Sequence, residues 1–268
     1  MINFEQYLAE RTSSVVNKEK RKVTGIELRQ MIGNKDTSIA DVDVSEIKDM
    51  SNLFRFSDFG RSWTADLSGW DTSNVTNMNS MFWGCGKVTE VVFSNTSKVR
   101  DMGRMFADCN NLTKVELPHT ENVTDMSDMF YACSQLKEVS LPNTQNVDNM
   151  SGMFSGCSGL TKVELPHTEN VENMQSMFAS CTSMTKVELS NTNKVENMSD
   201  MFYACSELTE VVIPNIGNVT DMANMFRGCT NLEQDFSNWD VNGKRKFEMF
   251  KYCTKMEGKN FYPNGYEQ

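Results

Sequence analysis

The most regularly placed reactive residues of this 268-residue chain are its eight cysteines, which recur every 24 residues from Cys85 to Cys253. A Met-Phe pair precedes each cysteine by a constant interval, beginning with Met81-Phe82. Thiolate and thioether sulfur are soft ligands that suit copper(I) or zinc. Each cysteine, however, lies three residues after the phenylalanine of its repeat, on the apolar side, where a free thiol packs as a small hydrophobic group. We therefore expect core thiols and no bound metal.

The same spacing argues against a disulfide framework. Disulfide-rich domains space their cysteines irregularly, whereas equivalent residues in successive repeats stack in a column. The amino-terminal segment MINFEQYLAERTSS has no basic start followed by an apolar stretch, so it does not resemble a secretory signal. We expect a reducing environment and free thiols.

The two histidines, His119 and His167, occupy equivalent positions two repeats apart. Stacked repeats would separate them by about 10 Å, whereas two imidazoles that share a zinc ion each bind it at about 2.1 Å. The sequence also shows no paired nucleophile and base and no glycine-rich phosphate loop. We therefore predict no metal site, no cofactor and no catalysis.

A fixed period between 20 and 50 residues is the signature of a solenoid. In the repeat at 110–133, Val115 and Leu117 alternate with polar residues, which predicts a short strand that Pro118 ends. Five apolar residues then follow at intervals of three, three, one and three, which predicts about three turns of helix. They are Val123, Met126, Met129, Phe130 and Cys133.

The flanking sequence predicts the ends of the array. A degenerate repeat with Ile47, Met50 and Phe54 brings the expected number of coils to about nine. Thr24 and Glu27 form a capping box at the start of a predicted helix that ends at Gly33. We therefore predict an α/β repeat fold, with a leader and capping helix at 1–33, a solenoid at 34–253, and a carboxy-terminal cap or tail at 254–268.

The net charge of −10 disfavours nucleic acid as the main partner, because phosphate binding requires a basic stripe. No segment approaches the roughly 20 apolar residues of a membrane helix, so no membrane insertion is expected. The activity expected of a long repeat surface is binding, and we expect the partner to be a protein.

Two sets of outward positions are candidate binding residues. Charges that alternate along the predicted strands can form a ladder that neutralises itself, or they can contact a partner. Aromatic residues that follow the repeat phenylalanine are typical interface anchors. The strand candidates are Lys114, Glu116, Lys137, Glu138, Lys162, Glu164, Lys186 and Glu188, and the aromatic candidates are Trp83, Tyr131 and Tyr203. The asparagines at 122, 146, 170 and 218 are expected to bond the backbone between coils.

The repeat pattern of Leu, Val, Leu-Pro, Val, Met, Met-Phe and Cys resembles the BspA-type, or Treponema-type, leucine-rich repeat over residues 39–253. The run at 70–82 looks like the variant found in mycoplasmal and other bacterial lipoproteins. This resemblance implies a right-handed leucine-rich-repeat solenoid of about nine 24-residue coils, each with a short parallel strand and a short helix. Family members are binding proteins and adhesins on cell surfaces. The chain departs from them in showing no signal peptide, lipobox or wall anchor.

The segment MINFEQYLAE resembles the capsid-targeting leaders of internal head proteins in T-even-type bacteriophages. Phe4, Gln6, Tyr7 and the Leu8-Ala9-Glu10 site match the leader pattern, which implies cleavage after Glu10. The sequence thus favours a non-enzymatic protein-binding scaffold that is packaged in a phage virion and delivered to the host cytoplasm. The alternative is a bacterial surface adhesin of the BspA type.

Overall fold

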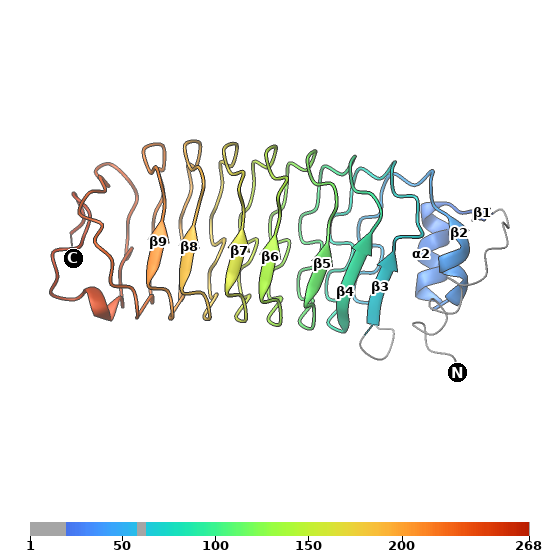
Figure 1. The fold of residues 1–268 in the computed structure, drawn as a ribbon, viewed down its shortest axis with the longest axis horizontal. Helices are drawn as coiled ribbons and strands as arrows, with labels where there is room; N and C mark the ends of the chain where they lie inside the picture. Colours follow the sequence, from blue (N-terminus) through green and yellow to red (C-terminus); the bar gives the residue numbers. More distant parts are fainter. Residues whose placement is uncertain (1–19, 58–62, 268) are drawn as a thin grey trace.

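The chain winds into a row of stacked coils whose strands lie side by side along one face (Figure 1). The structure is a computed structural model, and it describes residues 20–57 and 63–267. The strands of the row are β3 (Trp63–Leu67), β4 (Val88–Phe93), β5 (Lys114–Glu116), β6 (Glu138–Ser140), β7 (Lys162–Glu164), β8 (Lys186–Glu188) and β9 (Glu210–Val212). They pair in parallel within three groups, β3-β4-β5, β6-β7 and β8-β9.

The strand register follows the period of the sequence. Glu90 pairs with Lys114, Glu138 with Lys162, and Lys186 with Glu210, so each residue meets its own equivalent in the next coil. The predicted parallel strands are confirmed. A proline stands two residues after β5, β6, β7 and β9, where it limits the length of the strand because proline has no amide hydrogen for a ladder.

The helix predicted over Val123 to Cys133 is wrong, because this side of the coil is a series of turns. Within the coil, Met129 N–H donates to Met126 O at 3.3 Å and Cys133 N–H donates to Phe130 O at 3.0 Å. Between coils, Met126 N–H donates to Asn149 O at 3.0 Å and Phe130 N–H to Met153 O at 2.9 Å. Alternate amides therefore bond to the next coil, which a helix with internal bonds would forbid.

These turns require left-handed backbone at two positions of every coil. In the coil at 110–133, Asp128 has φ 51° and Ala132 has φ 59°. A hydrogen bond from residue i+3 back to residue i, with positive φ at residue i+2, is the arrangement of a type II turn. The first column contains Asn52, Ser80, Arg104, Asp128, Gly152, Ser176, Asp200, Asn224 and Glu248, and the second contains Phe56, Gly84, Asp108, Ala132, Gly156, Ser180, Ala204, Gly228 and Tyr252.

A column of single bridges gives the coil count. It links nine equivalent residues from Asp49 to Arg245, and these bracket eight coils, of which the first, between Asp49 and Asn77, is longer than the others. The fold is thus a β-solenoid of about eight coils with little helix, where the sequence predicted about nine coils with a helix in each.

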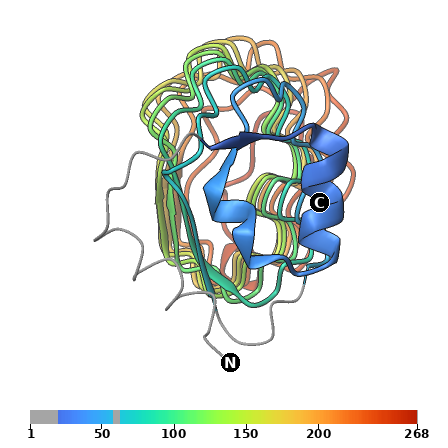
Figure 2. The same cartoon turned by 90° about the vertical axis from the view of Figure 1, so that its right-hand side faces the viewer.

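The amino-terminal end is closed by a different structure. Strand β1 (Arg21–Lys22) pairs with β2 (Val42–Asp43), and the helix α2 (Gly25–Gly33) and the 3-10 helix η1 (Thr37–Asp41) lie between them in the chain. The predicted capping box of Thr24 and Glu27 is confirmed, and Leu28, Met31 and Ile32 are buried in the common core. Viewed along the row, α2 lies over the end of the coils on the side away from the strands (Figure 2).

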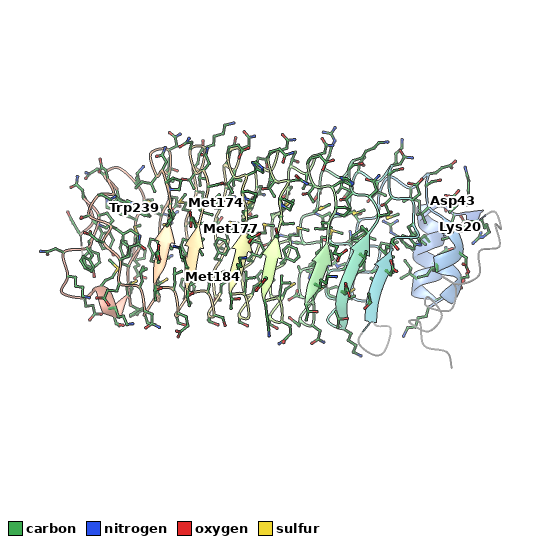
Figure 3. The ribbon with its side chains drawn as sticks, viewed as in Figure 1. Lys20, Asp43, Met174, Met177, Met184 and Trp239 are labelled. Carbon is green, nitrogen blue, oxygen red and sulfur yellow. The ribbon has the colours of Figure 1, made fainter. Side chains whose placement is uncertain are left out.

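The core consists of residue columns that run the length of the solenoid. The phenylalanine rings from Phe106 to Phe226 stack with centroids 5.4–5.7 Å apart. Methionines such as Met174, Met177 and Met184 are fully buried inside the coil (Figure 3). Trp70 stacks on Phe54 at one end of the column, and Trp239 packs against Phe226 at the other. Tyr262 and Tyr266 of the tail, which also contains η2 (Thr254–Met256), meet Phe250 edge-on.

The turn assignment predicts opposite effects for two substitutions in one column. Gly156 has φ 76°, and a Cβ there would lie 3.3 Å from the Ala132 Cα, so Gly156→Ala should lower the free energy of unfolding by about 1–2 kcal/mol. Ala132→Gly should be neutral or stabilising by up to about 1 kcal/mol, because relief of left-handed strain outweighs the greater entropy of the unfolded chain. Urea unfolding measures both. In a helix Ala132→Gly would instead cost about 1 kcal/mol, and that result would contradict the turns.

Candidate binding surfaces

The strand face, defined as the outward side chains of β4 to β9, carries ion pairs within and between coils. Lys114 Nζ lies 2.9 Å from Glu90 Oε1 and 2.6 Å from Glu116 Oε1. These two carboxylates, Glu116 before Glu90, raise the pKa of the Lys114 ammonium by accepting its hydrogen bonds. The other close pairs are Lys162–Glu164 at 2.6 Å and Lys186–Glu210 at 2.9 Å. All these lysines are exposed, where such pairs contribute about 0–1 kcal/mol each.

Three of the predicted strand-face residues stand outside this ladder. Lys137, Glu138 and Glu188 are exposed and form no ion pair with another residue of the described ranges. A shallow groove of about 410 Å³ crosses β7 between Pro142 and Ser190, with Val163 and Pro166 in its lining. The strand face is therefore mostly neutralised by its own charges and offers one small, partly apolar depression.

The turn face, defined as the side chains that follow each repeat phenylalanine, carries the aromatic candidates. Trp83 is partly buried, and its Nε1–H donates to Asp108 Oδ2 at 2.9 Å. The Arg55 guanidinium lies 3.9 Å from the centroid of the Trp83 ring, and the Phe56 ring lies 5.5 Å from it. Such a cation–π contact contributes about 0.5–1 kcal/mol at an exposed site. The Trp83 ring is thus positioned by its hydrogen bond to Asp108 and by its contacts with Arg55 and Phe56.

Tyr131 and Tyr203 are the more accessible anchors, with exposed fractions of 43% and 39%. A groove of about 310 Å³ connects Trp83 to Tyr131, and an ion pair of 3.2 Å between Arg104 Nε and Asp128 Oδ2 lies along it. Further along the row, Arg227 lies 6.0 Å from the Tyr203 ring centroid. The structure therefore brings Trp83 and Tyr131 into one groove and places Tyr203 three coils beyond Tyr131 on the same face.

Sequence reasoning missed four residues that extend this face. Arg55 and Phe56 flank Trp83, and Tyr252 flanks Arg227, whose guanidinium lies 5.5 Å from its ring centroid. Phe247, at the carboxy-terminal end, is among the most exposed large apolar residues. Phe56 and Tyr252 stand in the left-handed column, where small residues such as Gly84 and Ala132 are usual. A bulky residue at a column position where other coils have small ones is the sequence feature that could have identified Phe56 and Tyr252.

The cysteine column lies in the core, as predicted, and its thiols are free and buried. Each thiol donates to the phenylalanine carbonyl of the preceding coil, as Cys133 Sγ does to Phe106 O at 3.1 Å. Burial raises the pKa of the Cys157 and Cys205 thiols to about 12. The thiol column thus supports the turns and is not arranged as a nucleophile.

The thiols predict a loss of stability at alkaline pH. Their pKa is raised in the folded state, so the neutral thiol favours folding below the unfolded pKa of about 8.5. Above that value the unfolded chain ionises first, and this contribution should fall progressively as the pH approaches about 12. Urea unfolding between pH 7 and 10 measures the decline in the free energy of unfolding. In the control variant Cys157→Ala, Cys205→Ala this free energy should fall less steeply with pH, because two of the thiols are absent. A free energy of unfolding that rises over this range would contradict the assignment.

The remaining predicted positions have structural contacts or lie outside the described residues. His119 and His167 are exposed, with Nδ1 atoms 3.8 and 3.6 Å from Glu121 and Glu169 of their own coils. In residues 20–57 and 63–267, no three His, Cys, Asp or Glu side chains come together as a metal site. The predicted cleavage position Glu10 and the leader residues around it lie outside the described residues.

The asparagine column bonds the backbone between coils, as predicted. Asn122 Nδ2 donates to Ser97 O at 2.7 Å and Asn146 Nδ2 to Glu121 O at 2.6 Å. Asn170 and Asn218 repeat the contact. Among the described helices, none has the length and apolar character needed to cross a membrane.

Solved structures similar to this chain include bacterial leucine-rich repeat proteins. A leucine-rich repeat protein of T. pallidum is 23% identical with a TM-score of 0.40, and the match covers 72% of this chain and 70% of that one. A protein from Eubacterium ventriosum is 15% identical with a TM-score of 0.39, over 79% and 69% of the two chains. One from Bacteroides ovatus is 21% identical with a TM-score of 0.35, over 73% and 67%. No curated protein matches the chain.

A family model matches the repeats three times, over residues 26–138, 110–212 and 173–262. The three matches overlap and together span residues 26–262, which includes most of α2 and every strand from β3 to β9. The chain therefore belongs to the family described as Mycoplasma protein of unknown function, DUF285.

Proposed function

We propose that this protein is a non-enzymatic scaffold that binds a protein partner through the aromatic residues of its turn face. The observation that carries the proposal is the exposure of the Tyr131 and Tyr203 rings together with their hydroxyl groups, which are unpaired within the described ranges. Both rings are exposed, and neither hydroxyl has a hydrogen-bond partner among the described residues. An exposed tyrosine offers a large apolar ring and one polar atom at a small entropic cost, which is why tyrosine is enriched at interface anchors.

The backbone beneath these rings supports binding by preorganisation. Tyr131 follows Phe130, whose ring is stacked in the core column and whose amide bonds Met153 O. Trp83 is held by Asp108 and Arg55. Side chains that are ordered before the encounter lose less entropy on binding.

The strand face suits a partner less well. A partner that used Lys114, Lys162 or Lys186 would have to separate them from the glutamates they already contact at 2.6–2.9 Å. Removing both members of an exposed pair from water costs more than the pair itself contributes. The strand-face charges therefore keep the solenoid soluble and in register, and the turn face carries the binding.

The spacing of the anchors indicates a macromolecular partner. Trp83 and Tyr131 are two coils apart and Tyr203 is three coils further, so at about 4.8 Å per coil the row extends over about 24 Å. That span is typical of a protein interface of standard size and exceeds a small-molecule site.

The proposal predicts that a Tyr131→Ala, Tyr203→Ala variant loses at least about tenfold in partner affinity while its free energy of unfolding changes little. The matched control is Lys162→Glu with Glu164→Lys, which preserves the net charge of the strand face. Affinity capture from a host lysate, followed by titration of the captured protein, measures both. Full capture by the tyrosine variant together with loss of capture by the charge-swap variant would move the site to the strand face.

We also propose that residues 1–10 form a leader that is removed after Glu10, which would place the protein in a phage head before infection. Mass spectrometry of protein recovered from virions should find a chain that begins at Arg11, and Glu10→Gln should prevent the cleavage. An intact Met1 form in virions would contradict the leader. Labelling of the protein on intact cells by a membrane-impermeant reagent would favour the surface adhesin instead.

A further inference from the structure

The turns of the solenoid have a direction, because the amides at their left-handed positions donate toward the following coil. In the penultimate coil, Asn224 N–H donates to Phe247 O and Gly228 N–H donates to Lys251 O, both at 2.8 Å. The same two bonds occur from Asp200 and Ala204 to the coil after them. Every coil therefore needs acceptors from the next one.

The last coil has donors of the same kind without such acceptors. The amides of Glu248 and Tyr252, which are equivalent to those of Asn224 and Gly228, have no acceptor among the described residues. Between them, Phe250 N–H donates weakly to the Tyr266 hydroxyl at 3.4 Å. The amides of Glu248 and Tyr252 together form the donor edge.

The tail continues only the opposite side of the coil. Phe236 N–H donates to Phe261 O at 2.7 Å, and Val241 N–H donates to Asn264 O at 3.0 Å. Asp240 and Asn264 form a parallel bridge of the same kind as those between earlier coils. The tail thus supplies part of a further coil up to Tyr266 and leaves the turn side beside it uncovered.

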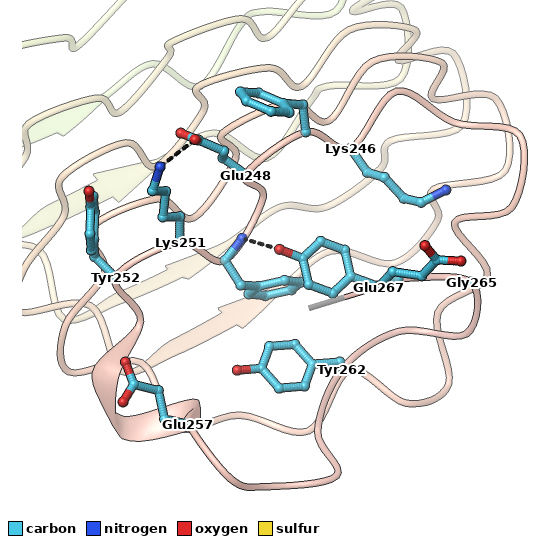
Figure 4. Close-up of a pocket in the computed structure, with 11 residues that line it drawn as sticks. Lys246, Glu248, Lys251, Tyr252, Glu257, Tyr262, Gly265 and Glu267 are labelled. Carbon is cyan, nitrogen blue, oxygen red and sulfur yellow. Dashed lines mark hydrogen bonds and ion pairs between the residues drawn. The ribbon is translucent and has the colours of Figure 1, made fainter.

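A cavity of about 680 Å³ lies at this uncovered place (Figure 4). Tyr262 and Tyr266 form its inner wall, and Phe247 and Tyr252 form its rim with exposed fractions of 67% and 57%. Lys251 pairs with Glu248 three residues before it in the lining, whereas Glu257 and Glu267 are exposed and have no ion pair within the described ranges. The cavity therefore combines backbone donors, apolar rings and unneutralised carboxylates.

The other end of the solenoid is built differently. There the Arg29 Nη2 of α2 donates to Ser51 O at 2.8 Å, and α2 lies over the turn side of the first coil (Figure 2). A second copy stacked head to tail would have to displace α2 and the buried Leu28, Met31 and Ile32. Two carboxy-terminal ends cannot join through these amides, because each end presents donors.

We propose that the donor edge binds a peptide segment of a partner protein, which continues the turn side as a further coil would and is held, as in strand addition, by main-chain hydrogen bonds. Two main-chain carbonyls of the segment accept hydrogen bonds from the Glu248 and Tyr252 amides. An apolar side chain packs against Phe247 and Tyr252, and a basic side chain lies near Glu257 and Glu267. This surface is separate from the Trp83, Tyr131 and Tyr203 row and goes beyond the proposed function.

The probe is a synthetic peptide with the sequence of residues 219–229 and serine in place of Cys229. It has the backbone of a turn segment, with Met222 and Phe226 as apolar residues and Arg227 as the basic one. Amide hydrogen exchange of the whole chain should show rapid exchange at Glu248 and Tyr252 and slow exchange at Asn224 and Gly228. Saturating peptide should slow exchange at the donor edge at least about tenfold. A scrambled peptide of the same composition should not.

Variants separate this site from the turn-face site. Tyr252 has φ 67°, so Tyr252→Gly removes the ring at a position where glycine suits the backbone, and it should weaken peptide binding about fivefold or more with Tm unchanged. Glu257→Lys combined with Glu267→Lys should also weaken peptide binding, because the basic side chain of the peptide then meets like charges. Tyr131→Ala should leave peptide affinity unchanged. Slow exchange at Glu248 and Tyr252 in the free protein, or peptide binding that leaves both amides unprotected, would overturn the proposal.

Discussion

The structure depends on hydrogen bonds that run between coils on both sides of the winding. On the strand side these are the bonds of a parallel ladder, and on the turn side alternate amides donate to the next coil while the others close turns within their own. Neither side can form these bonds in isolation. A single coil would leave its amides and carbonyls unsatisfied, and a buried unsatisfied group costs about 1–3 kcal/mol. The repeat must therefore hold a constant length so that each donor meets its acceptor.

This constraint explains which parts of the fold could be predicted from the sequence. The burial of Val123, Met126, Met129, Phe130 and Cys133 was predicted correctly, because apolar residues at intervals of three and four mark an inward face in any backbone that turns at that rate. The backbone was predicted wrongly for the same reason. Tandem turns and a helix bury the same positions, and the pattern does not say whether amides bond within the coil or to its neighbour. The capping box of α2 was predictable because its two hydrogen bonds are local.

The sequence feature that distinguishes these turns from a helix was spread over the two columns of residues with left-handed backbone. Glycine at 152 and 156 marks left-handed backbone in one coil, but equivalent positions hold Arg104, Glu248 and Phe56, which favour no such conformation. Left-handed backbone at these residues costs roughly 1–2 kcal/mol each, and the inter-coil bonds and the packed columns offset that cost. For the candidate surfaces, too, one part could be predicted from the sequence and another could not. Which residues point outward followed from alternation, whereas the pairing of Trp83 with Asp108 and Arg55 depends on coil stacking that single repeats do not encode.

Because inward positions are occupied by stacked Val, Met, Phe and Cys columns, variation that serves binding is confined to outward positions and to the two ends. Several outward charges on the strand side neutralise one another, as Glu90 and Lys114 do where the register places them side by side. The two ends of the solenoid also differ in the backbone groups that they leave to be bonded. In the turns, the amides of the two left-handed columns donate to the following coil. The first coil therefore has turn carbonyls that no earlier coil meets, and the last described coil has turn amides that no later described coil meets. Arg29 meets the acceptors at Ser51. The donors at Glu248 and Tyr252 are met by no described residue, and they are the groups that the proposed peptide would use.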